Sequence, residues 1–381
     1  MKKAVKRFLD VLIPAALSLV VAWLFILLPL SLSIFNVSQS LREQYDLIDA
    51  FTVIRNTRTD VVAKDLADNN ITIIDLSDVY DRGEIASIID TVLSCNPLAV
   101  GFDVALWHEK EDMDADARLA SLMKDSPVVV IPCQLFDEAQ PGGRDFRYVA
   151  RQFFVAKESF PAPNEAAANV DKEGITAVVR HFTTSLSLNG TEIDPFAVKL
   201  LKTVSPQRYA ELMARGNKTE HINFRRASYT AVTWSDKTKE RNMDLIPGRV
   251  VLIGDLSDEA DKFNTPIESR MPGVVLHAMT LDSMMRGAWI DESPDLLSWL
   301  VALVAAMLLI PVFRIIKRKS SWAGVLLPML QTVVILLFAF LSYWLFARFN
   351  YYIRPFQILL SVGFLDLADN LYKKTLSLIK P

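Results

Sequence analysis

The stretches ITIIDL at residues 71–76, LAVGFD at 98–103 and VVVI at 128–131 decide the fold class. Each is short, nearly continuously apolar and rich in β-branched side chains, which is typical of strands buried on both faces. Residues 85–93 place apolar side chains at helical spacing, and residues 112–123 form a second predicted helix. Strands that alternate with helices predict an α/β domain with a mainly parallel, or mixed, sheet.

The same alternation continues more loosely towards residue 292. The further predicted elements are a polar surface loop at 137–147, a hairpin turn at Asn189-Gly190, a helix at 195–203, a buried strand at 250–255 and a helix at 273–286. We therefore predict one α/β domain over residues 42–292.

Long uncharged runs flank this domain. The chain has 381 residues and a mean hydropathy of +0.24, and a helix of about 20 apolar residues crosses a bilayer. We predict transmembrane helices at 11–36, 295–313, 321–347 and 352–372, with cytoplasmic ends at 1–10 and 373–381. These runs exclude a soluble cytoplasmic enzyme, a disordered chain and a disulfide-rich secreted module.

The net charge of −3 is divided unequally along the chain. The N-terminus, the hinge at 314–319 and the C-terminal tail together carry eleven basic residues and one acidic residue, whereas residues 42–295 carry 28 basic and 41 acidic residues. Basic short loops mark the cytoplasmic side of a membrane. We expect a multi-pass protein of the bacterial inner membrane with both termini cytoplasmic and the acidic domain periplasmic or extracellular.

The first and fourth spans each allow a second interpretation. The first run resembles a cleaved signal sequence with Ser31-Leu32-Ser33 as the cleavage site, but it is longer than usual and favours an uncleaved anchor. In the fourth, Asp366 and Asp369 share one helical face. They either reach the cytoplasmic interface or contact a basic partner within the membrane, because intramembrane acids are costly and often functional.

The two cysteines, Cys95 and Cys133, are predicted to be free thiols. Cys95 precedes the second predicted strand and Cys133 follows the third. In neighbouring parallel strands those positions lie roughly 16 Å apart, which is too far for a disulfide.

Several short motifs run through the external segment. The early ones are IID at 73–75, AVGFD at 99–103 and DARLA at 116–120; the later ones are INF at 222–224, GRVVLIG at 248–254, Asp261, Thr265-Pro266 and PGVVLHA at 272–278. In order and spacing they resemble the second class of CHASE domain (cyclases/histidine kinases associated sensory extracellular). The resemblance covers about 42–290 and implies a bacterial sensory module anchored by flanking spans.

The chain departs from the pattern of that family at two places. Asp78-Val79-Tyr80-Asp81-Arg82 replaces a Trp- and Pro-rich stretch, and Phe224-Arg225-Arg226 replaces Phe-Arg-Gly. We also expect no cytoplasmic cyclase, kinase or phosphatase domain, because about ten residues precede the first span and some nine follow the last. If the replaced stretches line a ligand pocket, the resemblance implies a sensor whose ligand either differs from that of its relatives or is missing, and whose output is separate.

Acidic side chains end three of the predicted strands. Asp75, Asp103 and Asp255 should meet at one edge of the sheet, where open parallel sheets bind ligands. With Asp261, Thr265 and His277 they would form an oxygen-rich site for a divalent cation or a cationic ligand. Alternatively, the carboxylates close local turns, and His277 is a buried structural histidine.

No motif predicts a cofactor or catalysis. The sequence has no zinc spacing of Cys or His, no Gly-rich nucleotide loop and no Gly-x-Ser-x-Gly element. The acidic domain also argues against nucleic-acid binding.

Three functions compete on these observations. The first is a non-enzymatic receptor subunit that binds a small ligand or an envelope component and signals through a separate effector protein. The second is a structural or assembly subunit of an envelope complex. The third is an external hydrolase that uses the acidic edge. Besides the lipid bilayer, a homo-oligomer is a further expected partner.

Overall fold

The computed structural model describes residues 2–27, 47–57, 70–139, 143–173, 177–225, 229–234 and 239–379. The chain divides into two compact units, Thr52–Trp289 and Met1–Phe51 with Ile290–Pro381. We call them the sheet unit and the helical unit. Residues 28–36 of the predicted first span, with the Ser31-Leu32-Ser33 site, and residues 42–46 of the predicted domain lie outside the described residues.

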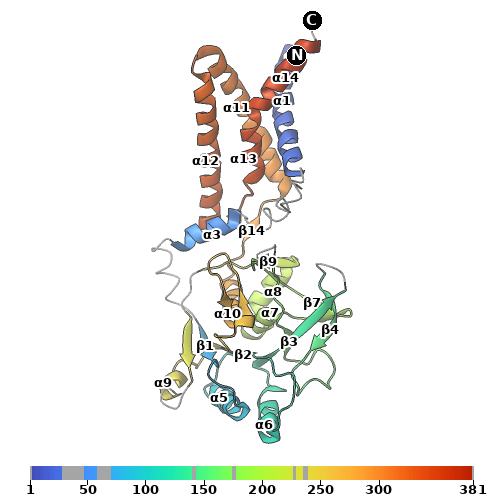
Figure 1. Cartoon of the computed structure of the whole chain (residues 1–381), viewed down its shortest axis with the longest axis vertical. Coiled ribbons are helices and arrows are strands. Elements are labelled where there is room, and N and C mark those ends of the chain that lie inside the picture. The colour runs from blue at the N-terminus through green and yellow to red at the C-terminus, as the bar shows by residue number, and fades with distance from the viewer. Residues whose placement is uncertain are drawn as a thin grey trace. The chain divides into compact units, whose positions relative to one another are not determined.

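A parallel core of five strands forms the centre of the sheet unit (Figure 1). Its order is β10-β1-β11-β2-β3, and all four neighbouring pairs are parallel. The bounds are β1 (Ile71–Asp75), β2 (Ala99–Asp103), β3 (Val129–Glu138), β10 (Thr230–Thr233) and β11 (Val250–Gly254). The predicted α/β class with a mainly parallel sheet is confirmed.

The sheet becomes mixed beyond β3. Strand β4 (Asp145–Ala150) pairs with β3 antiparallel, β5 (Glu165–Ala167) pairs with β3 parallel, and the hairpin β7 (Leu186–Leu188) and β8 (Thr191–Ile193) follows β4. The predicted loop at 137–147 is wrong at both ends, because β3 and β4 extend into it. The predicted turn is confirmed: Asn189 and Gly190 have φ of 47° and 81°, as a two-residue hairpin requires.

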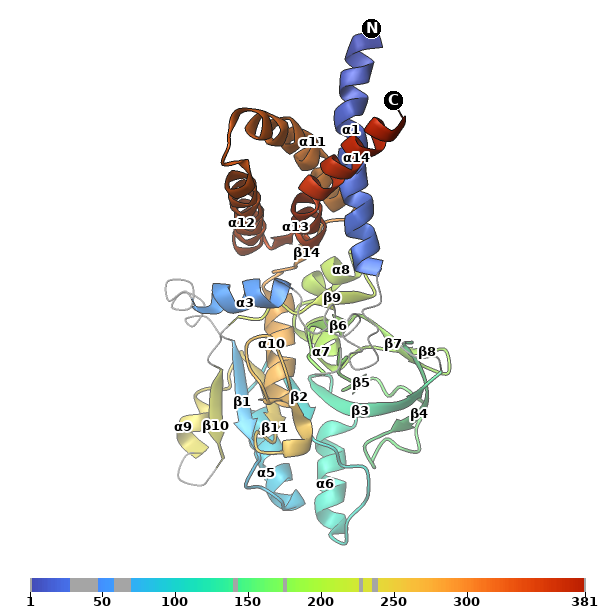
Figure 2. The same cartoon turned by 45° about the horizontal axis from the view of Figure 1, so that its top comes forward.

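Helices cover both faces of the parallel core (Figure 2). Adjacent side chains on a strand point to opposite faces, so Ile74 packs with α5 (Arg82–Ser94) and α6 (Met113–Met123), and Ile73 packs with α7 (Phe196–Val204) and α10 (Gly273–Met285). Helix α5 begins earlier than predicted because Asp81 caps it, accepting from Glu84 N at 2.9 Å.

The remaining elements of the sheet unit are short. They are β6 (His181–Thr183), α8 (Pro206–Ala214), β9 (Thr219–His221), α9 (Lys239–Met243), η1 (Glu259–Asp261), β12 (Lys262–Phe263) and β13 (Met271–Pro272). Strands β6 and β9 form an antiparallel pair, as do β12 and β13. Cys95 caps the end of α5 and Cys133 is buried in β3; both are free, as predicted.

The helical unit contains three helices that are long and apolar enough to span a membrane within the described part of the chain. They belong to α1 (Lys2–Leu27), α11 (Asp295–Lys319) and α12 (Ala323–Phe349). The predicted fourth span is divided into α13 (Phe356–Gly363) and α14 (Leu365–Ile379), and β14 (Asp291–Glu292) pairs with β15 (Tyr351–Tyr352). The placement of these helices in a membrane remains a prediction.

Small side chains line the packing of α1 against α11. Ala15 on α1 and Ala306 on α11 are fully buried in one cluster with Ile310 and Phe313. Small residues let two apolar helices approach closely, which is the usual basis of helix association in lipid. The division between the two units falls within α3 (Leu47–Thr57), whose Ile48 and Phe51 pack in the helical unit.

Candidate functional site

The carboxyl ends of the central strands lie in register. Asp75 at the end of β1 pairs with Gly254 at the end of β11, and Gly254 pairs with Asp103 at the end of β2. Asp255 follows Gly254 directly. Three of the predicted site residues therefore reach the same edge of the sheet, where we expected them.

Two of these carboxylates close local turns. Ser77 Oγ lies 2.5 Å from Asp75 Oδ1 and 2.9 Å from Asp255 Oδ1. Asp75 Oδ1 also accepts from Leu256 N at 3.2 Å, and Asp255 Oδ1 accepts from Ser257 N at 2.7 Å. Burial alone would raise the pKa of Asp255, but the hydrogen bonds from Ser257 and Ser77 outweigh it and lower the pKa. Asp75 and Asp255 thus hold the loops after β1 and β11 in place.

Asp103 differs from both of them. Its Oδ2 is enclosed by protein and has no hydrogen-bond partner in the described structure. Burial raises its pKa to about 7, because a charged carboxylate loses its hydration there. A buried polar atom without a partner is uncommon in a folded protein, so this oxygen is the unusual feature of the edge.

Asp261 and His277 come together beside Asp103. Burial, and then the nearby Asp103, raise the pKa of Asp261 to about 6, although His277 and the Gly273 N–H oppose the rise. Burial lowers the pKa of His277 to about 4, partly offset by Asp261. The imidazole is therefore neutral at pH 7, and the two carboxyl groups interact with each other near neutral pH.

Gly273 allows Asp261 to reach the first turn of α10. A Cβ at position 273 would overlap both carboxylate oxygens of Asp261. The absence of a side chain lets the carboxylate accept from the backbone N–H at the helix N-terminus, where negative charge is favoured. Thr265 belongs to a separate turn, since its Oγ1 donates to Glu268 O at 2.8 Å and accepts from Glu268 N at 3.1 Å.

The loops after β1 and β2 line an open groove of about 390 Å³ that sequence reasoning missed. Its lining includes Tyr80, Asp81, Arg82 and residues 109–112. Arg82 is buried, pairs with Asp116 and lies over the Phe153 ring at 4.9 Å. The signal available in the sequence was the charged run at 109–112 in the loop that follows the second strand, at the edge where ligands bind to parallel sheets.

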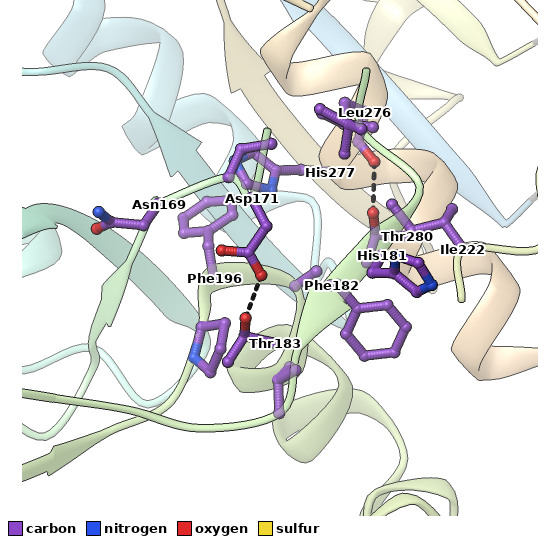
Figure 3. A pocket seen from close by; sticks show the side chains of 15 residues that line it. Asn169, Asp171, His181, Phe182, Thr183, Phe196, Ile222, Leu276, His277 and Thr280 are labelled. Atoms are coloured by element: carbon purple, nitrogen blue, oxygen red, sulfur yellow. Dashed lines mark hydrogen bonds between the residues drawn. The ribbon is translucent and has the colours of Figure 1, made fainter. Parts of the chain in front are cut away.

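His277 also borders a small cavity (Figure 3). Its ring lies 4.9 Å from that of Phe196, and Asp171, which also lines the cavity, accepts a hydrogen bond from the Thr183 hydroxyl. The cavity has a volume of about 30 Å³, which admits about one water molecule. Among the described residues, no three His, Cys, Asp or Glu side chains form a group that could hold a metal ion.

The two acids predicted to contact a partner in the membrane have basic neighbours in the helical unit itself. Arg314 Nη2 lies 2.7 Å from Asp369 Oδ1, and Lys317 Nζ lies 2.5 Å from Asp366 Oδ1. Asp10 on α1 contacts the same Arg314 at 2.7 Å. These pairs connect α1, α11 and α14. A contact between the two acids and another protein remains a prediction.

A family model described as the CHASE2 domain matches residues 15–315. No curated protein and no solved structure matches the chain.

Proposed function

The chain belongs to the CHASE2 domain family, a family of extracellular sensory domains, and from this membership we propose that it is a membrane-anchored receptor subunit. In this proposal the acidic sheet unit binds a small ligand or an envelope component outside the bacterial inner membrane. The helical unit spans the membrane several times with both termini in the cytoplasm. The family is sensory rather than catalytic, so we propose no reaction.

The observation that carries the proposal is the enclosed Oδ2 of Asp103. In a domain that serves only as a scaffold, a buried carboxylate oxygen is expected to have a donor. Here Asp103 lies next to Asp261 at the carboxyl edge of a parallel sheet. A ligand that donates a hydrogen bond or carries positive charge would satisfy Asp103 and offset the repulsion between the two carboxylates.

The proposal assigns the output to a separate effector protein. The matched region ends at residue 315, and beyond it the described residues form α12, α13, α14 and the two-residue β15. In this proposal these helices transmit a change through what they contact in the membrane or at its surface. Asp366 and Asp369 are the proposed contacts, as part of an ionic cluster that another charged chain can enter.

A thermal-shift experiment on the full chain in detergent tests the ligand site. The probes are putrescine, spermidine and Mg²⁺, as simple members of the cationic class, and a binder raises the Tm by mass action. We expect a probe to stabilise the wild type and to lose its effect in Asp103→Asn. The exposed Asp90→Asn is the matched control. An equal shift in both variants would place binding elsewhere and would contradict the site.

The structural alternative is tested by crosslinking in membranes. A receptor subunit should capture an effector whose yield changes when the stabilising probe is added. A constant yield, with the same envelope partners under all conditions, would instead identify an assembly subunit without ligand switching.

A further inference from the structure

A second groove lies in the sheet unit, in a part that the carboxyl-edge site does not use. Its walls come from the segment before β4, the β7–β8 hairpin and the loop after α8, and its volume is about 450 Å³. This size is within the range of sites for small molecules.

Two basic side chains in this groove have no acidic partner. Arg144 is half-buried and Lys218 is exposed, and neither side chain makes an ion pair or a hydrogen bond to a described residue. By contrast, other arginines of the sheet unit are neutralised, such as Arg151 by Glu165 at 2.6 Å and Arg215 by Glu220 at 2.6 Å. Positive charge that the protein leaves unpaired in a concave site attracts an anionic group.

The groove also offers one free hydroxyl and one free carboxylate. Ser185 is half-buried and its hydroxyl has no hydrogen-bond partner in the described part of the chain. Glu192, on β8, lines the same groove and pairs with no described cation. The groove therefore presents donors for an anion together with one acceptor for a cation.

Neighbouring polar groups hold the walls in position. Thr184 Oγ1 donates to Asn217 O at 2.8 Å, and Ser187 Oγ donates to Asp145 Oδ1 at 2.7 Å. Gly190 and Gly216 both have positive φ, and a Cβ at either position would meet nothing within 4 Å. Open space thus remains between walls that are already hydrogen-bonded. The free-energy cost of ordering the site when a ligand binds is therefore small.

We propose that this groove binds a small zwitterion, namely a free amino acid or a short peptide with an unmodified amine and an unmodified carboxylate. Arg144 and Lys218 bind the ligand carboxylate, Arg144 in a two-point contact. Ser185 donates to the same carboxylate, and Glu192 binds the ammonium. This site is separate from the one at Asp103, and the proposal does not depend on the proposed function.

Calorimetric titration of the full chain in detergent with the dipeptide alanyl-alanine tests the assignment. We expect saturable binding that weakens by roughly 10- to 100-fold in Arg144→Gln, which removes a charged hydrogen bond. Glu192→Gln should also weaken binding, while Lys157→Ala, an exposed lysine outside the groove, should not. Asp103→Asn should bind the dipeptide as well as the wild type does, which separates this site from the carboxyl edge.

Three comparison ligands make the assignment falsifiable. N-acetyl-alanyl-alanine lacks the amine charge, alanyl-alanine amide lacks the carboxylate, and inorganic phosphate is a simple anion; each should bind more weakly than the dipeptide. Equal affinity for the acetylated dipeptide, or tighter binding of phosphate that Arg144→Gln abolishes, would identify a general anion site and overturn the zwitterion. If the folded wild type does not bind the dipeptide, and the variants have the same Tm as the wild type, the proposed site is wrong.

Discussion

Arg55 donates a hydrogen bond from Nη2 to Oδ1 of Asn223 at 2.5 Å. The same guanidinium reaches Phe224 O at 3.1 Å, and Asn223 Nδ2 donates to Ala288 O at 2.7 Å. One buried asparagine of the INF motif therefore joins α3, where the chain enters the sheet unit, to the segment after α10, where it leaves.

Replacing Asn223 with Ala should destabilise the sheet unit. The substitution leaves the buried Arg55 and the carbonyl of Ala288 without these partners, which costs roughly 1–3 kcal/mol and lowers the Tm by about 2–4 °C per kcal/mol for a domain of this size. Asn223→Asp retains the acceptor for Arg55 and should be less harmful. A thermal melt of the full chain in detergent should give the highest Tm for the wild type, a lower Tm for Asn223→Asp and the lowest for Asn223→Ala. The exposed control Ser87→Ala should have the Tm of the wild type.

Gly273→Ala should push Asp261 away from α10. The new Cβ occupies the space of the Asp261 carboxylate, and such overpacking typically costs about 1–3 kcal/mol. Removing the carboxylate in Asp261→Ala should relieve the clash, so the double variant should be more stable than the sum of the two single effects. Additive effects in a denaturation cycle would contradict the close contact.

The stability of the wild type relative to Asp103→Asn should fall as the pH rises from about 4 to about 7. Burial raises the pKa of Asp103 to about 7 in the folded state, so the folded protein holds this proton more tightly than the unfolded chain does. The resulting stabilisation is full below the unfolded pKa and is lost as the pH rises through the folded pKa.

Asp261 shifts in the same direction, whereas His277 shifts in the opposite one. The parts of these two shifts that come from burial are common to both proteins and cancel in the comparison, whereas the repulsion between Asp261 and Asp103 exists in the wild type alone and adds to the fall. Denaturation at a series of pH values measures how the difference in unfolding free energy between the wild type and Asp103→Asn changes with pH. Asp90→Asn is the exposed control. A constant difference across this range would show that Asp103 titrates normally.

Glu165→Gln should be strongly destabilising. The side chain of Glu165 is fully buried. Its carboxylate accepts hydrogen bonds from Arg151 Nε at 2.8 Å, from Arg151 Nη2 at 2.6 Å and from Ala162 N at 2.9 Å. Breaking one side of a buried ion pair costs about 3–5 kcal/mol. Asp90 and Arg118 form an exposed pair, so Asp90→Asn should cost no more than about 1 kcal/mol. Urea denaturation of both variants should show this contrast.

Asp369→Asn should weaken the attachment of α14 within the helical unit. Asp369 has 1% of its side-chain surface exposed and contacts Arg314 and Lys373, so the variant leaves Arg314 with Asp10 alone as its acidic neighbour in the described structure. We expect faster proteolysis after residue 363 in membranes and lower yield of any crosslinked effector. Ser377→Ala is the control, because Ser377 is exposed on the same helix and, among the described residues, its hydroxyl bonds only to Lys374 O within that helix. Unchanged proteolysis and yield would contradict both roles.

The fold class was predictable from local pattern. The strands at 71–75, 99–103 and 250–254 are short and continuously apolar, and the intervening helices show the 3.6-residue period, so each element is specified by its own residues. The β3–β4 extension escaped prediction because alternate positions there face solvent, among them the exposed Phe136 and Tyr148, and the pattern therefore resembled a loop.

The candidate site was predictable only as a neighbourhood. Parallel strands end at one edge of a sheet, so the strand pattern alone placed Asp75, Asp103 and Asp255 together. Ser77 and Ser257 bond to the carboxylate two residues before each of them, but the bonds from Leu256 to Asp75 and from Ser77 to Asp255 join loops that are far apart in the chain. The groove with Arg144, Ser185, Glu192 and Lys218 likewise combines residues from three separate segments.

The sequence by itself determined the composition of each part: uncharged helices with basic flanks, an acidic α/β domain, and the motifs of the CHASE2 family. These features depend on local hydropathy, charge and residue period, which a linear chain already contains. Only the tertiary structure decided that Asp103 is the carboxylate left without a donor and that Asn223 joins the two ends of the sheet unit. Burial and hydrogen-bond partners depend on contacts between segments that are distant in the chain, and local sequence patterns do not reveal those contacts.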